Sequence, residues 1–129
     1  MDSFDDNVKN AYYCKIVDFV NTLNNKQCTN VCYIKGKLFE YISAIYFKSR
    51  LYDNISTDYK EQLNLSNYDC DSNSAGVDII DTLNNKIIQC KYYKQKTLYR
   101  SNITNFVITL LNLYNKFTGL LAVNADITL

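Results

Sequence analysis

The stretch that decides the fold is residues 76–93, which read GVDIIDTLNNKIIQCKYY. Two runs within it, residues 77–81 and residues 86–93, are typical of β-strands because isoleucine and valine favour extended backbone. Between them, Asn84-Asn85 can form a tight turn, since asparagine tolerates the left-handed conformation that such a turn requires. We therefore expect these residues to form a β-hairpin.

The length of the turn determines which side chains share a face of the hairpin. A two-residue turn would place Asp78 opposite Lys91 and Ile80 opposite Gln89. Since side chains alternate between faces, these four would project together, about 5–8 Å apart, as an acid, an amide and an amine beside isoleucine. Asp78 and Lys91 could instead form an ordinary surface ion pair, worth only about 0–1 kcal/mol. The opposite face is expected to be the core face, with Val77, Ile79, Ile88, Cys90 and Tyr92.

Three other segments repeat apolar residues at the spacing of a helix that packs one face on a core. They are residues 4–24, residues 36–49 and residues 101–117. Ser101 is the expected N-cap of the last helix, and Gly119 is its expected stop. Residues 120–123 are typical of a buried strand, and residues 59–67 give a weak signal for one more. The resulting order, helix, helix, strand, strand, strand, helix, strand, predicts an α/β fold with a mixed sheet flanked by helices.

Composition narrows the chemistry that the protein can use. The chain has 129 residues, enough for one domain, and 47% of them are hydrophobic, enough for a core. A net charge of +1 argues against a polycationic protein that coats nucleic acid. Because histidine is absent, triads with a histidine base and histidine-ligated zinc are excluded. Any catalysis must use carboxylates, lysine, tyrosine, cysteine or a metal ion on oxygen ligands.

The N-terminal residues 1–6, MDSFDD, are acidic, so we expect no signal peptide. No stretch reaches the ~20 apolar residues of a membrane-spanning helix. We therefore predict a cytoplasmic or nuclear protein that is not secreted and has no membrane partner. In a reducing compartment, the five cysteines are expected to be free thiols. The alternative is a zinc site on Cys28 and Cys32, which are spaced C-x3-C, together with Cys70 and Cys90, which do not form a CxxC pair.

The segment that follows the hairpin is basic. Residues 91–100 hold four cations and no acid, interleaved with tyrosines, in a chain whose overall charge is nearly zero. Such a stretch is typical of a surface that binds nucleic acid, although a solvated loop has the same composition. The cations are Lys91, Lys94, Lys96 and Arg100, and the tyrosines are Tyr92, Tyr93 and Tyr99.

Three short motifs together resemble a known superfamily. They are Lys35-Gly36-x3-Glu40 on a helix, Gly76-Val77-Asp78, and Gln89-Cys90-Lys91. Their order is similar to that of the PD-(D/E)xK nucleases, and closest to the branch of Mrr-like restriction endonucleases. The resemblance implies a restriction-endonuclease-like αβββαβ core, here with an extra N-terminal helix. Two residues depart from the common pattern: Val77 replaces proline, and Gln89 stands where many members have an acid.

This resemblance implies a metal-dependent endonuclease that hydrolyses phosphodiester bonds in DNA with Mg²⁺ or Mn²⁺. Asp78 would be the central metal ligand, and Glu40 would bind the metal directly or through water. Gln89 would add its amide oxygen and Cys90 its main-chain carbonyl. Lys91 would orient or help deprotonate the attacking water. Nucleic acid would be held by Lys35, Tyr93, Lys94, Lys96 and Arg100.

The resemblance also implies a single nuclease-like domain, with residues 1–34 as a helical extension and residues 35–129 as the catalytic core. The domain could be excised from a longer protein that has a helicase or specificity domain, and it could form a homodimer. Three alternatives stay open. The chain could bind nucleic acid without cutting it, since Gln89 carries no charge. It could resolve Holliday junctions, since Lys35-Gly36-x3-Glu40 also resembles archaeal resolvases, or it could be a plain interaction domain.

Overall fold

A four-stranded mixed sheet lies at the centre of the computed structural model, which describes residues 3–62, 76–92, 97–98, 103–113, 116–124 and 126–127. The helices in these ranges are α1 (Asp6–Asn24), α2 (Val31–Phe47), the short 3₁₀ helix η1 (Tyr52–Asn54), α3 (Thr57–Gln62) and α4 (Thr104–Asn112). The strands are β1 (Arg50–Leu51), β2 (Ile79–Asp81), β3 (Lys86–Lys91), β4 (Thr97–Leu98), β5 (Thr118–Val123) and β6 (Asp126–Ile127).

The central sheet has the strand order β1-β2-β3-β5. Its first three strands are antiparallel neighbours, whereas β5 runs parallel to β3 after a crossover through α4. Strands β4 and β6 form a separate parallel pair. The expected α/β class, with helices around a mixed sheet, is confirmed. Helices α1 and α2, the hairpin strands β2 and β3, helix α4 and strand β5 come in the expected order, and β1, η1, α3, β4 and β6 are further elements that the sequence did not predict at these positions.

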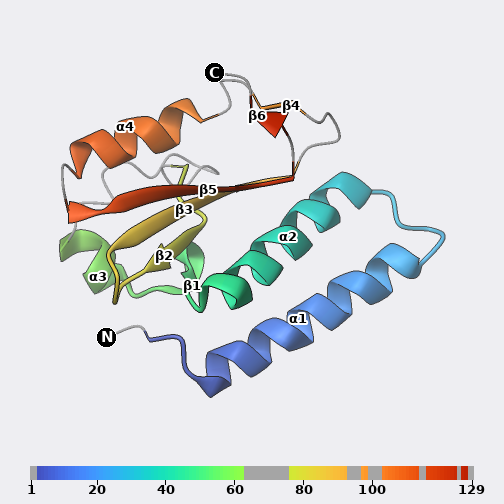
Figure 1. The fold of residues 1–129 in the computed structure, drawn as a ribbon. Helices are drawn as coiled ribbons and strands as arrows, with labels where there is room; N and C mark the ends of the chain where they lie inside the picture. Colours follow the sequence, from blue (N-terminus) through green and yellow to red (C-terminus); the bar gives the residue numbers. More distant parts are fainter. Residues whose placement is uncertain are drawn as a thin grey trace.

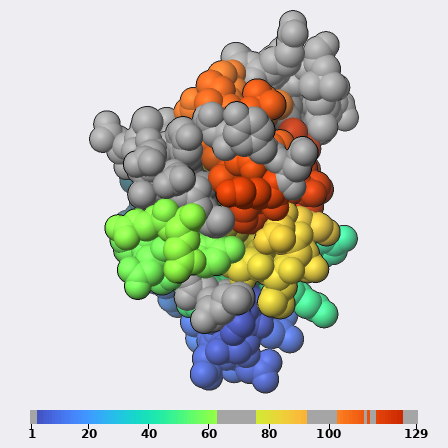
Figure 2. Space-filling view, turned by 90° about the vertical axis from the view of Figure 1, so that its left-hand side faces the viewer, coloured from blue at the N-terminus to red at the C-terminus, as the bar shows by residue number. Residues whose placement is uncertain are grey.

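Helices cover both faces of this sheet (Figure 1). Helices α1 and α2 lie on one side, and α4 lies on the other. Figure 2 shows the same order from another direction, with the blue residues of α1 at one end and the orange residues of α4 towards the other. Because both faces are covered, the central strands β2 and β3 are rich in isoleucine at consecutive positions, as expected for strands buried on both sides.

Each face has its own hydrophobic cluster. The α2-side cluster is centred on Tyr12, Ala44, Leu51, Ile79 and Ile88. The α4-side cluster is formed by Tyr52, Ile55, Val77, Ile80, Ile87, Phe106, Leu113 and Phe117. Consecutive isoleucines of one strand therefore belong to different clusters, which fixes the strand between the two helical layers.

The first two helices agree with the periodicity, with one shifted boundary. Helix α1 begins where the side chain of Asp5 accepts a hydrogen bond from the N–H of Val8 at 2.9 Å. Helix α2 begins at Val31 instead of residue 36. Its first turn has no side-chain cap, so packing against α1 rather than a local signal stabilises it. The C-cap residue that follows helix α2 is Lys48, which adopts the left-handed conformation with φ of 52°.

The third predicted helix is shorter than its apolar pattern. Helix α4 covers Thr104–Asn112, and Ile103 holds the N-cap position; the proposed cap, Ser101, lies outside the described residues. Gly119 does not stop this helix, because it lies within β5. Its lack of a side chain has another reason: a Cβ atom there would lie 2.6 Å from Leu110 Cδ2 of α4.

The predicted strand at residues 59–67 is wrong where the structure describes it. Residues 57–62 form helix α3 instead, and residues 63–67 lie outside the described ranges. The strand that precedes the hairpin is β1, which has only 2 residues, Arg50 and Leu51. So short a strand shows no alternation of apolar and polar residues, and only its pairing with β2 identifies it.

The hairpin forms, but its register differs from the prediction by two residues. Asp81 pairs with Lys86, so residues 82–85 form a four-residue loop in place of the expected two-residue turn. The Asp81 carboxylate accepts hydrogen bonds from the N–H groups of Leu83, at 3.0 Å, and Asn84, at 3.1 Å, which stabilises the longer loop. Asn85 adopts the left-handed conformation, as its residue type predicts.

The new register changes the partners of the polar residues. Ile79 pairs with Ile88 and Ile80 with Ile87, so Ile80 is not opposite Gln89 and Asp78 is not opposite Lys91. A shift of two residues leaves the faces of these isoleucines as predicted, because side chains repeat with a period of two.

One face assignment in the hairpin is wrong. Val77 packs in the α4-side cluster, whereas Ile79 packs in the α2-side cluster, so the two do not share a face. The regular alternation therefore breaks between them. Gly76, with φ of 77°, precedes this break, and its own position against Phe106 of α4 leaves no room for a side chain. Asp78 lies at the break.

Candidate functional site

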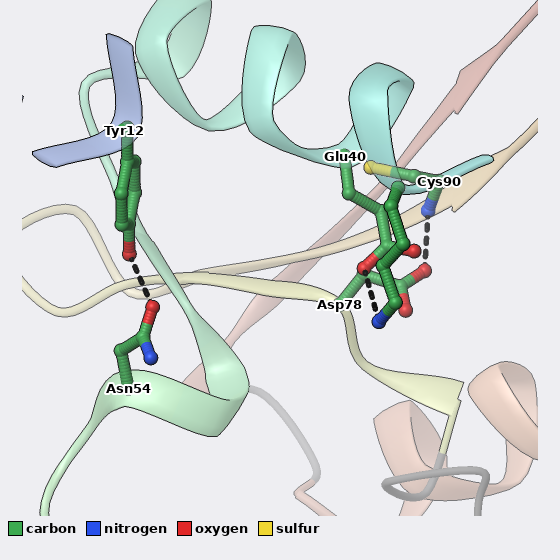
Figure 3. A network of polar contacts seen from close by, with 6 residues as sticks. Tyr12, Glu40, Asn54, Asp78 and Cys90 are labelled. Atoms are coloured by element: carbon green, nitrogen blue, oxygen red, sulfur yellow. Dashed lines mark hydrogen bonds and ion pairs between the residues drawn. The ribbon is translucent and has the colours of Figure 1, made fainter. Parts of the chain in front are cut away.

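Two carboxyl groups from different elements meet beside the end of the β2–β3 ladder. Glu40 extends from α2, and Asp78 lies just before β2. Figure 3 shows their carboxyl groups next to each other, with Cys90 of β3 beside them. The hairpin brings Asp78 and Cys90 together, and the packing of α2 on the sheet adds Glu40, which is far from both in the chain.

Asp78 is held on both sides by backbone hydrogen bonds. Its N–H donates to the carbonyl of Ile88 at 3.0 Å, and its carbonyl accepts from the N–H of Tyr52 at 2.8 Å. Its side-chain Oδ2 accepts from the N–H of Cys90 at 2.7 Å. The Asp78 carboxylate thus accepts a hydrogen bond that a backbone carbonyl would accept if the ladder continued. The position of Asp78 is determined by β3 on one side and by η1 on the other.

Glu40 has a cation close by on its own helix. Lys37 Nζ lies 3.8 Å from Glu40 Oε1, at the i, i+3 spacing that brings side chains together on a helix. The exposed fraction of the Glu40 side chain is 22%. Lys37 Nζ also lies 5.9 Å from the centre of the exposed Tyr33 ring.

Burial makes both carboxyl groups hard to ionise. The pKa of Glu40 is raised to about 7, mainly by burial and in part by the nearby charge of Asp78, while Lys37 opposes the shift. The pKa of Asp78 is also raised by burial, while the Cys90 N–H, Lys91 and Lys37 lower it in part. Two adjacent acids with raised pKa values form a site that additional positive charge would stabilise.

Gln89 and Lys91 approach Asp78 from the other side of the sheet. In β3, Ile88 and Cys90 pack in or against the α2-side cluster, and Ile87 packs in the α4-side cluster. Alternation therefore directs Gln89 and Lys91 from β3 towards the side of α4, away from α2 and Glu40. The prediction that the polar groups share one face is wrong in this respect. Asp78 lies at the strand end between both sets, since Lys37 and Lys91 both act on its pKa.

Gln89 is the most enclosed polar group of the predicted set. The residue is only 5% exposed, and it is paired with Leu121 in the neighbouring strand β5. Among the described residues, its Oε1 atom has no hydrogen-bond partner. A buried amide oxygen without a partner costs free energy, so it is available to a ligand that can supply positive charge or a donor.

Cys90 contributes through its main chain, because its thiol is inert. Burial raises the pKa of the Cys90 thiol to about 12, with Asp78 and Glu40 adding to the shift. A thiol with so high a pKa is neither a nucleophile nor a metal ligand at neutral pH. The Cys90 N–H belongs to the site through its hydrogen bond to Asp78, and the role of the Cys90 carbonyl as a metal ligand stays a prediction.

The predicted nucleic-acid contacts are largely outside the described residues. Tyr93, Lys94, Lys96 and Arg100 fall in undescribed segments, so their positions stay predictions. Lys35 is described and exposed on α2, but no interaction places it at the two carboxyl groups.

Two site residues were missed from the sequence. Lys37 is the cation of α2 that contacts Glu40, and its i, i+3 spacing could have revealed it. Asp53 in η1 also raises the pKa of Glu40. No local pattern relates Asp53 to Glu40, because β1 and η1 reach this place only through the tertiary fold.

The residues present fit a magnesium ion better than zinc. Within the described ranges, no group of three or more histidine, cysteine or acidic side chains is arranged to hold a metal. Zinc would need such a set, and Cys70, the fourth proposed thiolate, lies outside those ranges. Magnesium often binds to only one or two carboxylates together with water and substrate phosphate. The adjacent Glu40 and Asp78 carboxyl groups agree with that chemistry.

Comparison with known protein families, curated proteins and solved structures finds no match to this chain. The interpretation of the site therefore depends on its own geometry and on the motifs. In the described part of the chain, no helix has both the length and the apolar character that crossing a bilayer requires.

Proposed function

We propose that the protein is a metal-dependent endonuclease that hydrolyses phosphodiester bonds in DNA. The observation that carries this proposal is the pair of adjacent buried carboxyl groups, Glu40 and Asp78, with cations on both sides of the sheet in Lys37 and Lys91. Such a pair is costly to the fold when ionised, and a structural role does not require it.

Order and spacing of elements support the same proposal. Helix α2 carries Glu40 and is followed by β1. Asp78 lies directly before β2, and β3 carries Gln89 and Lys91. Helix α4 and strand β5 come after them. This is the αβββαβ order that the PD-(D/E)xK resemblance implies. The finer assignment, a restriction-endonuclease-like core, belongs to this proposal.

Glu40 and Asp78 would hold a Mg²⁺ or Mn²⁺ ion, with the Cys90 carbonyl as a further oxygen donor. Gln89 projects from the face of β3 opposite to Glu40, so its amide oxygen is left out of this set. When bound, such an ion supplies charge for the scissile phosphate and lowers the pKa of a bound water. Lys91 would hold a phosphate oxygen or accept a proton from water. Lys37 would neutralise Glu40 and contact the substrate backbone.

The central test replaces Asp78 with asparagine. Asp78→Asn keeps an oxygen that can accept the Cys90 N–H but removes the charge, so we expect Mg²⁺-dependent cleavage to be lost while the fold is kept. Asp81→Asn, three residues further along at the end of β2, is the matched control and should cut like wild type. The assay uses plasmid, single-stranded DNA and RNA with Mg²⁺, Mn²⁺ or EDTA, and circular dichroism checks the fold. Wild-type cleavage by Asp78→Asn would disprove the assignment.

A second variant tests the role of the lysine on β3. Lys91→Met should cut at least ~10²-fold more slowly, the low end for one group that transfers protons. Lys86→Met, at the other end of the same strand, is the control. Equal rates for the two variants would remove Lys91 from the site.

Gln89 favours one second candidate, a domain that binds nucleic acid without cleaving it. Its neutral amide takes the place of a carboxylate, so the site has two acids to hold a metal instead of three. Binding of labelled DNA that is promoted by Mg²⁺, without cleavage in the same tubes, would select this candidate.

A further inference from the structure

A cavity of about 330 Å³ lies between α1, α2 and the β1–η1 segment. One stripe of α1 forms a wall of it, with Val8, Ala11, Tyr12 and Lys15 at helical spacing. Tyr41 of α2 and two residues that follow α2, Arg50 and Asn54, form the opposite walls. None of these residues belongs to the candidate catalytic site, and Figure 3 shows the Tyr12–Asn54 pair apart from Glu40 and Asp78.

The hydrogen-bond acceptors of this cavity are already used within the protein. The Tyr12 hydroxyl donates to Asn54 Oδ1 at 2.9 Å and accepts from the N–H of Leu51 at 2.8 Å. The Arg50 side chain also interacts with this hydroxyl. What Asn54 can still offer a ligand is its NH₂ group, which is a donor.

The charged groups of the cavity have one sign. Among the described residues that line it, Lys15 and Arg50 are charged, both positively, and no carboxylate is present. Donors and cations together attract an anion, because an oxygen-rich ligand can contact several of them at once. Arginine and lysine are both residues that commonly bind phosphate.

The remaining walls suit a flat organic group. Tyr41 presents a partly exposed ring, which packs edge to face on the buried Tyr12 with ring centres 5.1 Å apart, and Val8 and Ala11 add apolar surface. Aromatic rings stack on nucleobases without regard to sequence. The volume of the cavity is at the lower end of the range for small-molecule sites, which agrees with a ligand the size of one nucleotide.

We propose that this cavity binds a nucleotide through its phosphate, with Lys15 and Arg50 on the phosphate and the Tyr41 ring beside the base. A free mononucleotide and a nucleotide within a nucleic-acid strand share this chemistry. The site is independent of the proposed hydrolysis, because it uses neither Glu40 nor Asp78.

Isothermal titration calorimetry in EDTA tests the site with four probes: adenosine monophosphate, adenosine, inorganic phosphate and a short single-stranded oligodeoxynucleotide. Adenosine monophosphate should bind wild type, and Lys15→Met should weaken it roughly tenfold, as expected for one hydrogen bond to a charged group. Lys26→Met, an exposed lysine outside the cavity, is the matched control and should bind like wild type. Adenosine and inorganic phosphate alone should each bind more weakly than the nucleotide.

The result decides both the site and the source of the phosphate. Tighter binding of the oligodeoxynucleotide, also weakened by Lys15→Met, assigns the site to a nucleic-acid strand, and tighter binding of the mononucleotide assigns it to a free nucleotide. The proposal is overturned if adenosine monophosphate does not bind, if adenosine binds equally well, or if both lysine variants bind alike. Asp78→Asn should leave this affinity unchanged, so failure of the catalytic proposal can be distinguished from failure of this one.

Discussion

Glu40 is an acid in a place where water does little to stabilise its charge. Burial and the neighbouring Asp78 raise its pKa to about 7, although Lys37 lies 3.8 Å away. The folded protein therefore holds a proton on Glu40 that the unfolded chain, with an ordinary glutamate, has already lost. Between the two pKa values, rising pH favours the unfolded state. The ionised Glu40 thus destabilises the metal-free fold at neutral pH and above.

Glu40→Gln should remove this penalty. In EDTA, we expect the free energy of unfolding of the variant to exceed that of wild type by about 1–3 kcal/mol at pH 8, and the difference to shrink as the pH falls to 5. Urea unfolding at several pH values measures it. Glu61→Gln, at an exposed position of α3, is the control and should follow wild type. A difference that does not vary with pH would show that the pKa of Glu40 is not raised.

At the scale of elements, Gly76 determines where β2 begins and so where Asp78 lies. Its φ of 77° is in the left-handed region, and a Cβ atom there would lie 2.7 Å from the backbone N of Phe106 in α4. Backbone cannot move aside as a flexible side chain can. The backbone before β2 and the first turn of α4 therefore pack closely against each other at Gly76.

Gly76→Ala should destabilise the fold by more than about 2 kcal/mol, because a left-handed alanine costs roughly 1–2 kcal/mol and the contact with Phe106 adds to it. Gly36→Ala is the opposite case. Gly36 lies inside α2 with nothing within 4 Å of an added Cβ, so alanine should stabilise the protein by about 0.5–1 kcal/mol. Chemical denaturation compares the two. Similar stability of both variants would contradict the close approach at Gly76.

At the scale of the whole molecule, the sheet is held between two hydrophobic clusters. Ile87 and Ile88 are consecutive in β3, and both are completely buried, one towards α4 and the other towards α2. A strand in a sheet with one face exposed to solvent would bury only one of these two side chains. The stability of the domain therefore depends on both helical layers.

Ile87→Ala and Ile88→Ala should each lower the free energy of unfolding by about 2–5 kcal/mol, the usual cost of truncating a buried isoleucine. Leu83→Ala in the hairpin loop should change it little, because Leu83 is 75% exposed. Denaturant titration of the three variants measures these changes in the free energy of unfolding. If only one of the two isoleucines mattered, one helical layer would not pack on the sheet in solution.

Local patterns predicted part of the fold and part of the candidate site. The 3.6-residue periodicity identified α1, most of α2 and the centre of α4, since an amphipathic helix carries its signal within its own residues. The motifs identified Glu40 and Asp78. Strand β1 and residue Asp53 could not be predicted, because a two-residue strand and a distant charge have no local signal.

The sequence by itself determined the α/β class, the hairpin and the types of polar residue near it, because these follow from the spacing of apolar side chains along short segments. The tertiary structure alone decided the face of Val77 and the meeting of Glu40 with Asp78. Gly76 packs on Phe106, and α2 packs on the sheet. Each of these depends on free energies of contact between residues that local propensity does not relate to one another.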